Sequence, residues 1–219
     1  MFAIGHFALG YLTGKGSSRL LKAKINLPLL LVASILPDID LILQLINPTL
    51  FMHRGPTHSI ITFTVLLIPF FIIYKKQAVP YYAALLSHSL IGDFFTGGIK
   101  LFWPVSNGWF GNNLIPMGGS ADVIAELALF AVATTIMFKA KDLQALIRPK
   151  NHNLTLIIVF GAVLAPLLSA GRAFESSLPL LLVAPSIFWL ILFSYSMLVE
   201  LRARPENPPP NDPSTEHPG

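Results

Sequence analysis

Long apolar blocks are the feature that most constrains how this chain can fold. The chain has 219 residues, of which 53% are hydrophobic and only 12% are charged, whereas a soluble domain usually has about 25% charged residues. So few charges cannot cover the surface of a water-soluble domain of this size. Most of the blocks have the roughly 17–25 residues that a helix needs to cross a bilayer. We therefore expect an all-α fold, a polytopic transmembrane bundle of about 6–7 helices.

Short polar connections separate the apolar blocks and set the domain limits. We expect one transmembrane helical domain over residues 1–202. Residues 203–219 hold six of the 18 prolines, and this composition is typical of a disordered tail, here predicted to be cytoplasmic. The predicted helical segments cover residues 2–24, 26–46, 58–74, 79–95, 121–138, 154–171 and 178–199.

Basic residues distinguish the two sides of the predicted bundle. Twelve of the 15 lie in one alternating set of connections and three lie in the other set. Because basic residues concentrate in cytoplasmic loops, we predict an integral protein of a prokaryotic plasma membrane with its N-terminus outside and its C-terminus in the cytoplasm. The cytoplasmic set is Lys15, Arg19, Lys22, Lys24, Lys75, Lys76, Lys139, Lys141, Arg148, Lys150, Arg202 and Arg204, and the outer set is Arg54, Lys100 and Arg172.

Charge and cysteine content exclude several classes of function. The net charge is +4, but the basic residues lie between apolar blocks and form no continuous stripe, so we expect no nucleic-acid partner. The chain has no cysteine, which excludes disulfides, thiolate catalysis and Cys-ligated metals. Histidine and carboxylate side chains remain as the strong metal ligands.

Histidines and aspartates from separate segments fall at a similar depth, toward the predicted outer side. A charged group at the centre of a membrane helix costs at least about 2.5–3.5 kcal/mol, and clustered carboxylates repel one another unless a cation is present. A divalent metal ion binds neutral imidazole together with ionised carboxylate, and this mixture suits zinc, manganese or iron better than calcium. The candidate ligands exceed one tetrahedral shell, so the pattern also fits two ions. They are His6, Asp38, Asp40, His53, His58, His88 and Asp93.

Two of the motifs, LPDID and HRGPTHS, combine these ligands with helix-breaking residues. Asp38 and Asp40 are two residues apart, about 200° around an ideal helix, so both can face one point only if the helix breaks, and Pro37 predicts such a break. The alternative is a helix end with solvated aspartates. In HRGPTHS, Thr57 is predicted to cap the following helix. Arg54 is predicted to bind an anionic substrate group, or else to pair with a nearby aspartate or with lipid headgroups.

Spacing in the fourth segment poses a similar problem. His88 and Asp93 are five residues apart, about 140° on an ideal helix, so they share a ligand only if Gly92 loosens the turn or Asp93 lies beyond the helix end. Asp122 and Glu126 share one helix face. Whether they join the site is left open, because an acidic residue also stabilises a helix N-terminus.

The motifs together resemble a known family. GHFALGYLTG, LPDID, HRGPTHS, SHSLIGDFFTGG and LFWPVSN occur in this order over residues 1–107. This arrangement resembles the LexA-regulated, membrane-bound metal-dependent hydrolase family (YdjM-like). The resemblance implies an integral membrane protein with metal-linked residues at His6, Asp38, Asp40, His53, His58, His88 and Asp93.

Three functions fit these features. The leading hypothesis is a hydrolase that acts on a phospholipid or lipid-linked phosphoester near the outer face, with Asp40, Arg54 and Asp93 as catalytic residues. Its partners are membrane lipids and a phosphate-containing substrate. The second is a transporter of metal ions or protons, which needs ionisable groups across the whole bilayer. The third is a structural protein whose metal ties helices together, which predicts a closed coordination shell.

Overall fold

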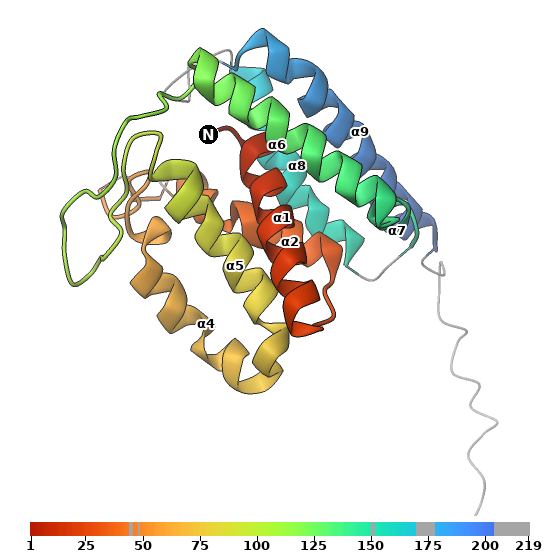
Figure 1. Ribbon diagram of the computed structural model, residues 1–219, viewed down its shortest axis with the longest axis horizontal. Coiled ribbons are helices and arrows are strands. Elements are labelled where there is room, and N and C mark those ends of the chain that lie inside the picture. The colour runs from red at the N-terminus through yellow and green to blue at the C-terminus, as the bar shows by residue number, and fades with distance from the viewer. Residues whose placement is uncertain (44–45, 48, 150–151, 170–177, 204–219) are drawn as a thin grey trace, which may run out of the picture.

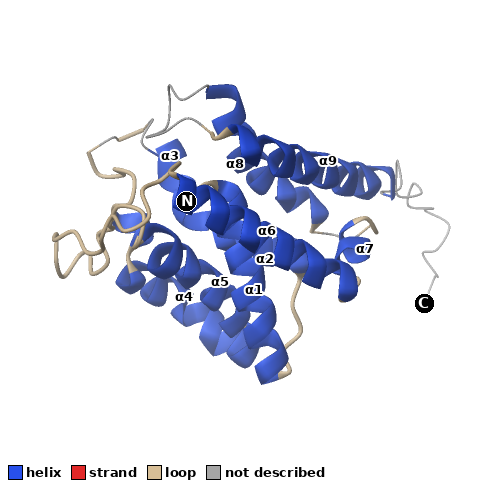
Figure 2. Ribbon diagram, turned by 45° about the horizontal axis from the view of Figure 1, so that its top comes forward, coloured by secondary structure: helices blue, strands red, loops and turns tan. Residues whose placement is uncertain are grey.

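All regular structure in the described residues is helical. The computed structural model describes residues 1–43, 46–47, 49–149, 152–169 and 178–203 (Figures 1 and 2). The predicted all-α fold is confirmed. Within these ranges the β-type pairing is one isolated bridge between Ile99 and Phe110, in the long loop between two helices. Of the predicted disordered tail, Ala203 ends a helix, and residues 204–219 lie outside the described part of the chain.

The helices follow the predicted apolar segments. Among the described residues, three stretches are long and apolar enough to cross a membrane: Ile60–Gln77, Ser120–Lys139 and Leu180–Ala203. In chain order the elements are α1 (Ala3–Leu21), α2 (Leu27–Ile35), the 3₁₀ turn η1 (Leu36–Ile39), α3 (Asp40–Leu43), η2 (Pro56–His58), α4 (Ile60–Tyr74), η3 (Lys75–Gln77), α5 (Val79–Ser87), the π turn η4 (His88–Asp93), α6 (Ser120–Lys139), α7 (Asp142–Leu146), η5 (Asn153–Thr155), α8 (Leu156–Ser169) and α9 (Leu180–Ala203).

Helix α1 lies at the centre of the bundle. It contacts α2, α5, α6, α8 and α9, with α4 and α5 on one side of it and α6 and α9 on the other (Figures 1 and 2). Small residues permit this close packing, as they do in many membrane bundles. A Cβ atom on Gly10 would overlap Ser34 of α2, and one on Gly14 would lie 2.5 Å from Leu30 Cδ1.

Polar contacts, one group buried and one half-buried, hold α1 at its N-terminus and in its C-terminal half. At its N-terminus, the Glu126 carboxylate of α6 accepts hydrogen bonds from Phe2 N at 2.7 Å and from Gly5 N at 3.1 Å. These amides lack partners inside the helix, and a negative charge also suits the positive end of the helix dipole. Farther along α1, Lys15 Nζ lies 2.6 Å from Asp142 Oδ2 of α7. Glu126 therefore positions α1.

Helix α4 is apolar in composition and lies at the outside of the bundle. Phe63 is its one buried residue, and apolar side chains such as Ile72 and Ile73 are about two-thirds exposed, at 70% and 68%. A soluble protein rarely exposes so large an apolar patch. Lipid contact accounts for this surface.

The α1–α2 crossing yields a test of the fold. Gly10→Ala should destabilise the protein by about 1–3 kcal/mol, because the added methyl group forces α1 and α2 apart. Thermal unfolding in detergent micelles measures the change. Gly16→Ala is the matched control, since a Cβ atom there meets nothing within 4 Å. Equal melting temperatures for Gly10→Ala and the wild type would show that this crossing is not tight.

Candidate metal centre

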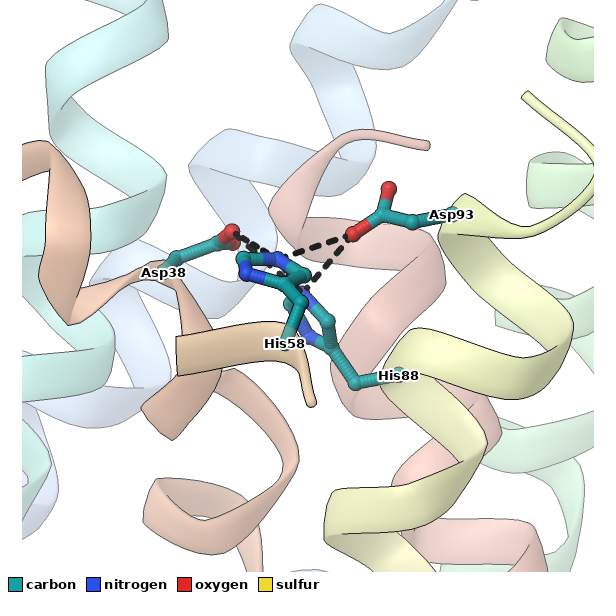
Figure 3. Close-up of side chains that lie close together, drawn as sticks. All are labelled: Asp38, His58, His88 and Asp93. Atoms are coloured by element: carbon teal, nitrogen blue, oxygen red, sulfur yellow. Dashed lines mark hydrogen bonds and ion pairs between the residues drawn. The ribbon is translucent and has the colours of Figure 1, made fainter. Parts of the chain in front are cut away.

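Four of the predicted ligands point at one another from three separate parts of the chain (Figure 3). Asp38 comes from η1, His58 from η2, and His88 and Asp93 from η4. Each offers one donor atom, and these four atoms all lie within 4.8 Å of one another. Three of the four side chains are buried, and Asp38 is half-buried.

The distances between the donor atoms fit a four-coordinate ion. His58 Nε2 lies 3.2 Å from His88 Nε2, 3.1 Å from Asp93 Oδ2 and 3.6 Å from Asp38 Oδ1. His88 Nε2 lies 3.3 Å from Asp38 Oδ1 and 3.2 Å from Asp93 Oδ2. Metal–ligand bonds of about 2.0–2.2 Å in a tetrahedral shell place the ligand atoms roughly 3.3–3.6 Å apart. These five donor–donor distances therefore lie within about 0.2 Å of the spacing in a tetrahedral shell.

Hydrogen bonds at the far side of each ring direct both histidines. His88 Nδ1 lies 2.8 Å from the Ser34 carbonyl oxygen, which can only accept, so Nδ1 carries a proton. His58 Nδ1 lies 3.2 Å from Asp40 Oδ2 and donates to it in the same way. In the neutral rings each Nε2 atom then carries no proton, and its lone pair faces two carboxylates. Such backing by a carboxylate or carbonyl is typical of metal-bound histidine.

This group of acceptors requires positive charge. Burial by itself lowers the pKa of His58, in the loop before α4, but the carboxylates of Asp38, Asp40 and Asp93 raise its pKa well above the usual value. A proton or a metal ion on Nε2 satisfies the same electrostatic requirement. The two therefore compete for this atom.

The predicted break at Pro37 is present and determines where the two aspartates of LPDID lie. Helix α2 ends at Ile35 and continues as the 3₁₀ turn η1 before α3 begins at Asp40. Asp38 Oδ1 lies 3.6 Å from His58 Nε2, whereas Asp40 Oδ2 lies 3.2 Å from Nδ1 of the same ring. The two carboxylates thus contact opposite edges of one imidazole, and only Asp38 belongs to the group of four.

A π turn brings His88 and Asp93, five residues apart in sequence, to the same side of the helix. Phe94 N donates to Ser89 O at 3.0 Å, a bond across five residues. This wider turn brings residues five apart onto one face, which an α-helix cannot do, and such turns are frequent at functional sites. Asp93 lies inside the turn, so its predicted alternative position beyond the helix end is wrong.

His6 lies behind the group of four and outside it. Its ring stacks on His88 with centroids 3.6 Å apart and an angle of 13° between the planes, and its Nε2 lies 3.6 Å from Asp93 Oδ1. Gly92 provides the space, since a Cβ atom there would lie 2.5 Å from His6 Cε1. Gly92 and His6 together restrict the position of the His88 ring.

Asp40, His53 and His58 form a second, smaller group. The buried Asp40 carboxylate lies 3.1 Å from His53 Nδ1 and accepts from Thr57 Oγ1 at 2.8 Å and from Arg54 N at 3.1 Å. An ion at this group would need His58 Nδ1, which already donates to Asp40. The contacts favour a hydrogen-bond network here.

The loop around Arg54 bears out one of the two predictions for Arg54 and overturns the one for Thr57. The Arg54 guanidinium is buried, 3.4 Å from Asp93 Oδ1 and 3.3 Å from Thr96 Oγ1. These contacts support the alternative in which it pairs with an aspartate. The predicted cap at Thr57 is wrong: Ser59 caps α4 by accepting from Ile61 N at 3.2 Å, while Thr57 bonds to Asp40.

Comparison with known proteins identifies a membrane-protein family. The sequence model of a family described as YdjM inner membrane protein matches residues 1–172. The chain belongs to this family. The YdjM match includes all seven predicted ligands and the helices around them, and it supports a location in the membrane. Comparisons with curated proteins and with solved structures give no match.

Metal content tests the centre directly. Purified wild-type protein should contain a divalent metal ion, and His88→Ala should lose most of it because one of four donors is removed. Inductively coupled plasma mass spectrometry gives the ratio of metal to protein. His152→Ala, a change at an exposed histidine, is the control and should retain the ion. Equal metal content in the two variants would contradict the centre.

Gly92 gives a second test that leaves every ligand in place. Gly92→Ala should push the His6 ring against His88 and weaken metal affinity about 10–100-fold. Mutations of residues that orient metal ligands typically have effects of this size. Competition with a chelating dye measures the dissociation constant. Gly16→Ala, again with open space around its added methyl group, should bind as the wild type does. An unchanged metal dissociation constant in Gly92→Ala would show that His6 does not restrict the His88 ring.

Proposed function

We propose that this YdjM-family protein is a membrane-embedded hydrolase that holds one divalent ion, zinc by preference, and cleaves a phosphoester of a membrane lipid. The donor spacing of Asp38, His58, His88 and Asp93 is the observation that carries the proposal, because distances of 3.1–3.6 Å match a four-coordinate shell. The chemistry of two imidazoles with two carboxylates also fits zinc better than calcium.

A cavity beside the centre supports a reaction there. It has a volume of 390 Å³ and is lined by His6, Asp38, His53 and Asp93 at the site, and by apolar residues elsewhere. A molecule in this cavity touches two of the four donor residues. A purely structural ion needs no such space.

His53 is the residue best placed to move a proton. Its Nδ1 lies 3.1 Å from Asp40 Oδ1, so Asp40 fixes the ring and leaves Nε2 as the basic atom. A divalent ion supplies Lewis-acid polarisation of the phosphoryl group and makes water more acidic. In the proposed reaction a water oxygen bonds to phosphorus and the ester P–O bond breaks. His53 takes the proton from the water and gives it to the leaving oxygen.

Asp40 and Asp93 have roles other than the general base in this proposal. Asp40 positions His53 and His58, and Asp93 is a ligand whose other oxygen lies 3.4 Å from the Arg54 guanidinium. Arg54 acts through Asp93 by balancing its charge. From the distribution of basic residues we further propose that the site lies at the outer face, with the N-terminus outside.

A structural ion is the second candidate, because four protein donors already fill a four-coordinate shell. Under this alternative the ion joins the end of α2, the start of α4 and the end of α5. His53 then has no role in function, since it lies outside the group of four.

The His53→Gln variant separates the two candidates. Hydrolysis of phosphatidic acid and phosphatidylglycerol in mixed micelles is measured with the metal-loaded wild type and this variant. Loss of the general base should slow turnover about 10²–10⁴-fold while metal content stays the same. His152→Gln is the control and should be fully active. A metal-loaded wild type that hydrolyses neither lipid would exclude these substrates and favour the structural ion.

A further inference from the structure

The cavity extends well away from the metal centre along α8. Its lining on this helix runs from Ile157 to Pro166, which are nine residue steps and therefore about 13–14 Å apart along the axis. The site residues lie at one end of the bundle, where Phe2 meets Glu126 at the start of α6. Helix α8 begins at the other end, where Asn153 bonds to Arg148 O at 2.8 Å, just after α7. The cavity thus leads from the centre toward the opposite side.

Away from the centre the walls of the cavity are apolar. Ile35, Leu36 and Ile39 line the side formed by α2 and η1, and Gly161, Ala162 and Ala165 line the side formed by α8. None of these side chains can hydrogen-bond to a ligand. This apolar part of the cavity therefore offers no side-chain partner that would hold an ordered water.

Exposed apolar side chains lie on the edges of the cavity that α3 and α8 each contribute. Ile42 is 64% exposed and Ile157 is 57% exposed, and both line the cavity. In a membrane-spanning bundle, these edges meet lipid hydrocarbon. The cavity therefore opens sideways to acyl chains of the bilayer.

From these observations we infer that the cavity binds one hydrocarbon chain of a membrane lipid, with the lipid headgroup at Asp38 and His53. A volume of 390 Å³ holds about a dozen methylene-sized groups at the roughly 30 Å³ that a water-sized group occupies. This is room for a large part of one chain and not for two. The identity of the headgroup reaction rests on the proposed function, whereas chain binding does not.

Gly161 offers a way to fill the cavity without disturbing the fold. A Cβ atom on Gly161 meets nothing within 4 Å, although the residue lines the cavity. Gly161→Leu should therefore occupy the space of the chain. Gly16→Leu is the matched control, because Gly16 has equally open surroundings on α1 and does not line the cavity.

Photocrosslinking tests chain binding independently of hydrolysis. Wild-type protein in vesicles of phosphatidylglycerol that carries a diazirine on one acyl chain should crosslink at residues of the α8 wall, which peptide mass spectrometry identifies. Gly161→Leu should reduce this crosslink at least tenfold with unchanged metal content, and Gly16→Leu should leave it unchanged. Crosslinks confined to the outer surfaces of α4 and α9 in the wild type would overturn the inference.

Hydrolysis measurements then separate this inference from the proposed function. Gly161→Leu should slow hydrolysis of long-chain phosphatidylglycerol at least tenfold and leave that of the water-soluble dihexanoyl form unchanged. Crosslinking at the α8 wall without hydrolysis of either form would retain the chain site and reject the hydrolase. Equal hydrolysis of the long-chain lipid by Gly161→Leu and the wild type, with metal bound in both, would retain the hydrolase and reject the chain site.

Discussion

The arrangement around the centre depends on the mutual repulsion of four acceptor atoms in an apolar bundle. The Nε2 atoms of His58 and His88 face the carboxylates of Asp38 and Asp93 at 3.1–3.6 Å. In surroundings that screen charge poorly, such an arrangement is stable only with a proton or a metal ion among the donors. The ends of α2 and α5 and the start of α4 meet at this point, so an ion bound here would also join these parts of the bundle.

Departures from regular helix geometry create this meeting point. The 3₁₀ turn after Ile35 turns Asp38 and Asp40 to opposite edges of the His58 ring, and the π turn brings His88 and Asp93 together. Both irregularities cost helix stability, and their coincidence with the ligands is what a functional site predicts. Around them, Asp40 and the Ser34 carbonyl fix the two rings, and the neighbouring cavity gives the centre access to lipid.

Much of the fold and part of the site could be predicted from residue order. The apolar blocks predicted where the helices lie, and HRGPTHS together with LPDID predicted the candidate ligands. Both predictions need only side-chain type and spacing, which the sequence gives directly. The division of these ligands into four that converge and three that support them could not be predicted. Ser34 contributes a backbone carbonyl, which every residue has, and Arg54 pairs with Asp93 only because a loop folds over η4. Such contacts join residues far apart in sequence, and no local pattern encodes them.

The sequence by itself determined that this chain forms a helical membrane protein and that imidazole and carboxylate are the groups it offers to a metal ion, since hydropathy and side-chain chemistry are properties of single residues and short segments. Only the tertiary structure decided which atoms share one point, that His6 and Asp40 stand behind the ligands, and that an apolar cavity leads from the centre along α8. These features depend on distances between side-chain atoms and on side-chain directions, where a difference of about one ångström decides whether two atoms are in contact. They follow from how α1, α2 and α5 pack, where a glycine at position 10, 14 or 92 permits contacts that a larger residue would prevent.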